Sequence, residues 1–241
     1  MTRLEIIDLL TGNKALTFYI VFALSFIINR LPYAGVFFRT VNTMLHESGH
    51  AIAAILTSGE VIKIEYRKDT SGLAQTKTNG RFSAFLTSFA GYPFAALASS
   101  ILLILTINGQ FKIVAFILLS LVILNLILFV RNSFGIIWLI IFSILLIIIM
   151  IYANQLTQRI FLLFVCMIAF TETIASTAVI TFLGFTNGKK SGDMSNLKKI
   201  TGVSTAFWSI MNLVIVVSIL YYTVVNYFPW IKEVINQQVI E

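Results

Sequence analysis

The chain has little charge, one cysteine and almost no histidine. Its 241 residues include one cysteine, two histidines and ten acidic residues, and charged residues make up 11% of the total. The single thiol, Cys166, excludes an intramolecular disulfide and any metal cluster built from several cysteines. Soluble domains carry about 25% charged residues. This scarcity of charge, together with 58% hydrophobic residues, indicates an integral membrane protein.

The chain is nevertheless basic, with a formal net charge of +7. Such an excess could indicate binding to nucleic acid. In a membrane protein it is more typical of basic loops that face the cytoplasm and anionic lipid. We therefore expect membrane lipid, and no nucleic acid, as a partner of these residues.

Long apolar segments recur along the chain, most of them long enough to cross the roughly 30 Å of bilayer hydrocarbon. They predict an all-α polytopic membrane protein with about seven transmembrane helices, folded as one domain over residues 1–241. The first segment is short and the second is interrupted by a polar motif. The segments are Ala15–Ile28, Val36–Leu56, Phe82–Ile107, Ile113–Val130, Phe134–Tyr152, Ile160–Leu183 and Thr205–Phe228.

One stretch has the pattern of β-strands. Residues 61–66 alternate apolar and polar side chains, 67–72 have turn composition, and 73–78 can return as a partner strand. We expect a small β-hairpin over residues 60–80 at the membrane surface, directly after the second segment. The alternative is an irregular polar loop.

The distribution of basic residues predicts the topology. If all seven segments cross, the N-terminus, the hairpin and a loop over residues 184–203 lie on one side, which then holds most of the 17 Lys and Arg residues. The positive-inside rule makes that side cytoplasmic and the C-terminus external. We expect a multi-pass protein of the cell membrane.

The two histidines belong to one motif, His46-Glu47-Ser48-Gly49-His50, which has the form HExxH. Residues four apart lie on one face of a helix, so His46 and His50 can bind a single zinc ion. Glu47 is then placed to accept a proton from the attacking water as general base. The motif predicts a metalloprotease with one catalytic zinc. The alternative interpretation is that the motif only places two polar residues on a helix surface. This fits poorly with the apolar surroundings of the motif, where unpaired polar groups are costly.

A hydrolytic zinc site needs a third protein ligand. No third histidine exists, so this ligand should be a carboxylate. Besides Glu47, two acidic residues remain once those near the termini and in the hairpin are set aside. Glu172 lies inside an apolar segment, where a carboxylate is functional by default. Asp193 lies in the basic 184–203 loop, on the same side as the C-terminal end of the motif helix. These arguments leave both candidates open.

The order of several short motifs resembles the site-2 protease group of intramembrane zinc metallopeptidases, in its B-like branch. The matching residues are Leu45–Ala51 (LHESGHA), Ser71-Gly72 at the end of the hairpin, Ala90-Gly91-Tyr92, Phe161–Val165, Ser191-Gly192-Asp193-Met194 and Trp208. The family pattern near Asp193 is closer to Ser-Asp-Ala, so the inserted Gly192 is a departure.

This resemblance implies hydrolysis of peptide bonds within or beside the membrane, in transmembrane protein substrates, as in regulated intramembrane proteolysis. It also favours Asp193 over Glu172 as the third zinc ligand. A substrate helix must unwind before attack, and the hairpin could hold the unwound segment by edge pairing. Ile62, Ile64 and Tyr66 are the candidate substrate-binding residues.

Three other interpretations account for part of the sequence. A membrane zinc protease of the prenyl-protein-processing type would use Glu172 as the downstream ligand. A catalytically silent homologue would act as a membrane scaffold or regulatory partner, although the intact HExxH motif argues against silence. A transporter with Glu172 as a proton site would leave the motif unexplained.

Overall fold

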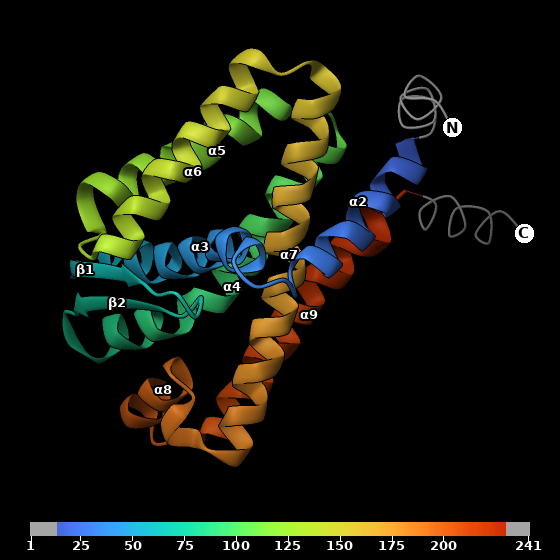
Figure 1. Ribbon diagram of the computed structural model, residues 1–241. Coiled ribbons are helices and arrows are strands. Elements are labelled where there is room, and N and C mark those ends of the chain that lie inside the picture. The colour runs from blue at the N-terminus through green and yellow to red at the C-terminus, as the bar shows by residue number, and fades with distance from the viewer. Residues whose placement is uncertain (1–13, 230–241) are drawn as a thin grey trace, which may run out of the picture.

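The computed structural model describes residues 14–229 and consists mainly of helices (Figure 1). In chain order the elements are α2 (Lys14–Ile28), α3 (Ala34–Leu56), β1 (Glu60–Tyr66), β2 (Gly72–Lys77), α4 (Gly80–Ile107), α5 (Phe111–Leu124), the π-helical turn η1 (Asn125–Phe129), α6 (Ser133–Tyr152), α7 (Gln155–Thr186), the 3₁₀ turn η2 (Gly188–Lys190), α8 (Asp193–Thr201) and α9 (Thr205–Tyr227).

Five helical segments are long and apolar enough to cross a membrane: α4, α5 with η1, α6, α7 and α9. The mostly helical prediction is therefore confirmed, but a count of seven spans is not. Helix α2 has 15 residues and a length of about 22 Å, which is short of the hydrocarbon thickness. Helix α3 has 23 residues but contains the polar motif. The crossing of the membrane by α2 and α3 stays a prediction.

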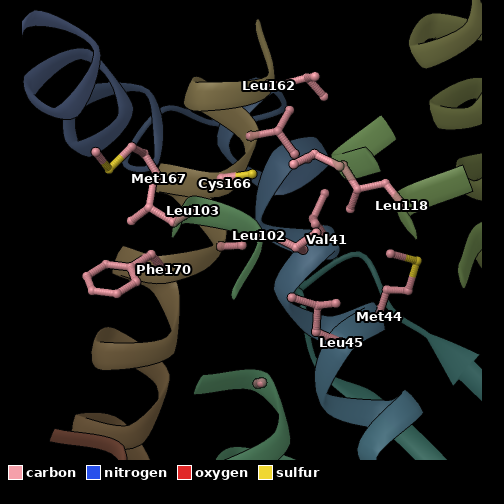
Figure 2. Close-up of a cluster of buried hydrophobic side chains, with 14 of the residues drawn as sticks. Val41, Met44, Leu45, Leu102, Leu103, Leu118, Leu162, Cys166, Met167 and Phe170 are labelled. Atoms are coloured by element: carbon pink, nitrogen blue, oxygen red, sulfur yellow. The ribbon is translucent and has the colours of Figure 1, made fainter. Parts of the chain in front are cut away.

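The centre of the molecule is the contact between α3, α4 and α7, with α5 closing one side. Figure 2 shows the buried side chains that α3, α4, α5 and α7 contribute to this core. Helix α4 brings small buried residues, among them Gly91, Ala95 and Ser99, which allow close approach of its neighbours. Between apolar segments in lipid, such close packing replaces the hydrophobic effect as the force that holds helices together.

The predicted hairpin is confirmed. Strands β1 and β2 pair antiparallel, with Ile64 opposite Ala74 and an irregularity in the register between Val61 and Lys63. The outer edge of β1 is partly occupied, because Ile64 forms a parallel bridge with Val130 and its carbonyl accepts the Arg131 N–H at 3.1 Å. The other edge of the hairpin is provided by β2, and both strands contact α3.

The segment over residues 184–203 is largely helical, unlike the loop expected from its polar composition. It contains the end of α7, the turn η2 and the short helix α8, which lies against α4 and α9 (Figure 1). Only two of its apolar side chains, Met194 and Leu197, are fully buried, and their spacing of three places both on one face. Glycines at both ends, Gly192 and Gly202, have positive φ angles of 51° and 80°. Positive φ favours glycine, which explains the abrupt ends of α8.

Candidate metal centre

The two histidines of the motif point into one site from successive turns of α3. Their Nε2 atoms lie 3.1 Å apart, and the rings are nearly perpendicular. His50 and Glu47 are buried, with 6% and 4% of their surface exposed. Two imidazole nitrogens this close, inside an apolar bundle, form an unfavourable pair unless a shared cation or proton lies between them.

Asp193 completes this group from the opposite end of the chain. Its Oδ2 atom lies 3.2 Å from His46 Nε2 and 3.3 Å from His50 Nε2. Burial by itself raises the pKa of the Asp193 carboxyl, but His50 and His46 outweigh this effect and hold the pKa below its ordinary value. Asp193 is therefore ionised at neutral pH, which is the form that binds a metal.

Two imidazole nitrogens and one carboxylate oxygen fit a zinc ion in type and in spacing. The three ligand atoms lie within 4.8 Å of one another. Zinc bonds of about 2.0–2.1 Å at tetrahedral angles place neighbouring ligand atoms about 3.3 Å apart. The observed separations of 3.1, 3.2 and 3.3 Å agree with this value. Three protein ligands leave one position of a tetrahedral site open, as in catalytic zinc sites.

Helix α4 orients the second histidine through a backbone carbonyl. His50 Nδ1 lies 2.6 Å from the carbonyl oxygen of Thr87. Since a carbonyl only accepts, Nδ1 carries the proton and Nε2 presents its lone pair to the site. Such partners of a metal-binding imidazole fix both the tautomer and the direction of the ring.

The same helix supplies the surface against which both imidazoles rest. A Cβ atom at Gly91 would lie 2.5 Å from His46 Cε1 and 2.6 Å from His50 Nε2, so only glycine fits here without displacing a ring. The next residue, Tyr92, packs edge-to-face on His46 with ring centroids 4.4 Å apart. Its side chain is within electrostatic reach of Asp193 and Glu47.

Glu47 lies between the metal-binding group and the hairpin. Its carboxylate accepts a hydrogen bond from the Ala74 backbone N–H and interacts electrostatically with both histidines and with Asp193. A Cβ atom at Gly72 would lie 2.2 Å from Glu47 Oε1, so β2 passes directly over this carboxylate. The hairpin therefore covers the side of the site on which Glu47 lies.

A polar network ties the hairpin to the helices. The Tyr66 hydroxyl donates to Asn125 Oδ1 at 2.9 Å, and Asn125 Nδ2 donates to Ser48 Oγ at 3.0 Å, next to Glu47. Asn132 Oδ1 accepts from the Tyr66 N–H at 3.1 Å, and Asn132 Nδ2 donates to the Tyr66 carbonyl at 2.6 Å. Asn125 opens the π-helical turn η1, a distortion that often marks functional sites. The network holds β1 in a fixed position beside the motif.

The predicted substrate-binding residues lie along β1. Ile62 is half-exposed, whereas Ile64 and Tyr66 are fully buried. Their role in substrate binding stays a prediction. Of the two strands, β2 runs closer to the site, through its contact with Glu47.

The alternative third ligand, Glu172, is engaged elsewhere. It accepts a hydrogen bond from Asn29 Nδ2 at 3.1 Å, and its other oxygen lies 3.9 Å from Arg39 Nη1. Among the described residues, the three-ligand group consists of His46, His50 and Asp193 without Glu172.

Sequence reasoning did not assign roles to Thr87, Gly91, Tyr92 or Asn125. Thr87 contacts His50 through its backbone carbonyl, so the identity of its side chain gives no sign of this role. Gly91 and Tyr92 belong to the Ala90-Gly91-Tyr92 motif, which contributed to the family resemblance. That motif was the sequence feature that could have indicated their place in the site. Asn125 is a single buried asparagine in an apolar segment, where polar residues are rare and functional.

Comparisons with known proteins agree with this geometry. The chain produced no match among curated proteins and no match among solved structures. The family model described as "Peptidase M50B-like" matches residues 17–223, which include all three residues of the metal-binding group and Glu47. The chain belongs to the M50B-like peptidase family, and the apolar helices place it among membrane proteins.

Proposed function

We propose that the protein is a zinc-dependent, membrane-embedded endopeptidase that cleaves transmembrane protein substrates. The observation that carries this proposal is the meeting of His46, His50 and Asp193 at zinc-like spacing, with the Glu47 carboxylate beside them. A silent scaffold would have no use for a carboxylate base next to an open three-ligand site. The prenyl-processing alternative requires Glu172, which pairs instead with Asn29 and Arg39.

His46, His50 and Asp193 would hold one zinc ion. When bound, zinc acts as a Lewis acid that polarises a carbonyl and lowers the pKa of water. Glu47 takes a proton from the attacking water and returns it to the leaving amine. Thr87 and Gly91 keep the two imidazoles in position for the metal, and β2 limits the access of bulk water to Glu47.

We assign Tyr92 to the substrate carbonyl. Its ring is fixed against His46, and its hydroxyl has no hydrogen bond to any described residue. A positioned hydroxyl of this kind stabilises the negative charge that develops on the carbonyl oxygen during attack.

The outer edge of β2 is the surface we assign to the unwound substrate. Because the Ala74 N–H points to Glu47, the alternation of a strand directs the Thr76 N–H to the same edge. An extended substrate paired with this edge would run past Glu47, bound through its backbone without demanding a sequence. Thr76→Pro removes one donor from the edge and should slow cleavage of a transmembrane substrate while zinc content stays unchanged. An unchanged rate would contradict this assignment.

The proposal includes the finer topology. Helices α2 and α3 complete a total of seven crossings in the cell membrane, and the N-terminus, the hairpin and the 184–203 segment face the cytoplasm. The metal-binding group then lies near the cytoplasmic end of α3. The excess of basic residues on these segments supports this orientation.

The proposed function is tested with purified protein in lipid nanodiscs. Wild type should contain one zinc per chain and cleave a reconstituted transmembrane substrate. Glu47→Gln should keep the zinc and lose activity by about 10²–10⁴-fold, the usual contribution of a general base. His50→Ala should lose both zinc and activity.

Glu65→Gln is the matched control, because it makes the same chemical change at a hairpin carboxylate paired with Lys63. It should retain full activity. Zinc-loaded wild type that cleaves no membrane substrate would support the silent scaffold, and an active Glu47→Gln variant would exclude Glu47 as the base.

A further inference from the structure

A cavity of about 470 Å³ lies between α2, α7 and α9. Except for Arg30 and Thr171, every residue that lines it is aliphatic or aromatic. None of these residues belongs to the metal-binding group or its immediate surroundings. Helix α2 meets α9 near the C-terminal end of α9, where Phe18 and Phe22 contact Phe228 (Figure 1). The cavity is therefore separate from the candidate catalytic centre.

One face of α2 lines the cavity for most of the length of this helix. Tyr19, Phe22, Phe26 and Arg30 follow one another at spacings of three and four residues, which places them in a single row. At 1.5 Å per residue the row is about 16 Å long. One leaflet contributes half of the roughly 30 Å of hydrocarbon, or about 15 Å. The row therefore has the length of one lipid acyl chain.

The end of the row carries a positive charge. Arg30 is the second residue after the end of α2. It is exposed and lies over the Phe26 ring, with its guanidinium carbon 5.5 Å from the ring centroid. No carboxylate of the described residues lies within salt-bridge distance of it. An aromatic contact restrains this guanidinium but leaves its N–H groups available.

The surroundings of Arg30 compensate its positive charge only in part. Glu172 is within electrostatic reach of both Arg30 and Arg39, so two cations share one carboxylate. Arg39 Nε is buried and has no hydrogen-bond partner. Uncompensated charge is costly beside lipid, so an anion at this end of the cavity would be stabilised. An apolar row with a cationic end matches an amphiphile whose headgroup is negatively charged.

We propose that this cavity binds one anionic phospholipid, with an acyl chain along the aromatic face of α2 and the phosphate at Arg30. The lipid would join α2 to α7 and α9 at a place where the helices leave a cavity between them. Binding at this site does not depend on the proteolytic activity.

The test uses the full-length protein and labelled phosphatidylglycerol or phosphatidylcholine. Native mass spectrometry counts the retained lipid, and titration of the labelled lipid gives its affinity. Wild type should retain one phosphatidylglycerol in preference to phosphatidylcholine. Arg30→Gln should lower the affinity for phosphatidylglycerol about fivefold, the effect of roughly 1 kcal/mol per basic residue near anionic lipid. The affinity for phosphatidylcholine should not change.

Ala175→Phe fills the cavity from α7 and should abolish retention of both lipids. Lys112→Gln is the matched control, since Lys112 is an exposed basic residue at the start of α5, outside the cavity lining. It should behave as wild type.

Two results would overturn the proposal. Equal retention by wild type, Arg30→Gln and Lys112→Gln would mean that the cavity holds only the lipid that surrounds any membrane protein. A raised KM for a transmembrane substrate in Ala175→Phe, with unchanged lipid retention, would identify a substrate helix as the occupant. Arg30 lies at the surface, so its substitution tests the headgroup contact even if Ala175→Phe does not fold.

Discussion

Gly91→Ala tests whether the two histidines bind metal in the observed arrangement. The added Cβ atom would lie 2.5 Å from His46 Cε1 and 2.6 Å from His50 Nε2. Ordinary contacts between carbon atoms are about 3.5–4.0 Å, so an imidazole would have to retreat by about 1 Å. Zinc sites hold their ligands within about 0.2 Å of the ideal distance. The substitution should therefore break at least one zinc–nitrogen bond.

The expected loss of zinc affinity in Gly91→Ala is at least 10²-fold, or about 2.8 kcal/mol. Loss of a partner that only orients a ligand costs 10–100-fold, and a direct clash with a ligand should exceed this range. The assay is a competition titration against a chromophoric zinc chelator, with circular dichroism to monitor helix content. The helix itself should persist, because alanine is the better helix former by about 1 kcal/mol.

Gly184→Ala is the control for this experiment. It makes the same change at a helical glycine, where the new Cβ atom would meet the Ser209 hydroxyl at 2.0 Å, between α7 and α9. Ser209 Cβ would also lie 2.8 Å away, so α7 or α9 must shift locally, and this contact includes no metal ligand. Zinc affinity should stay close to that of wild type. Wild-type affinity in Gly91→Ala would refute the reasoning, because His46 and His50 could not then both bind zinc in these positions.

Three further predictions concern the same site and its orientation. Asp193→Ala should lose zinc whereas Glu172→Ala should keep it, as measured by metal analysis; the opposite pattern would transfer the third ligand to Glu172. Tyr92→Phe should keep the zinc and the KM but lower kcat by roughly 10²-fold, and its affinity for a transition-state analogue should fall in parallel; an unaltered kcat would leave the hydroxyl without a catalytic role. Single cysteines at Lys68 and Lys190, in a cysteine-free background, should react with an impermeant reagent only from the cytoplasmic side, and labelling from opposite sides would contradict the seven-crossing topology.

Local sequence patterns predicted the features that depend on neighbouring residues. The scarcity of charge and the long apolar runs indicated a helical membrane protein, and five of the expected spans meet the length and composition criteria. Alternation at residues 61–66 predicted the strand β1. The four-residue spacing of His46 and His50 placed two imidazoles on one face of a helix, and the structure brings their Nε2 atoms together.

The tertiary structure decided what depends on distant parts of the chain. Local pattern could not choose between Asp193 and Glu172, because both are isolated carboxylates far along the chain from the motif. Packing of α8 against α4 and α9 brings Asp193 to the histidines, while Asn29 and Arg39 engage Glu172.

Local sequence patterns also could not predict the residues that surround the metal-binding group. The Thr87 carbonyl looks like any other in a sequence, and the need for glycine at position 91 appears only when α4 crosses α3. The sequence by itself thus determined the class of protein and the chemistry of its ligands, because composition and periodicity are local properties. Helix packing decided which residues complete the site, because contacts between distant segments depend on the whole bundle.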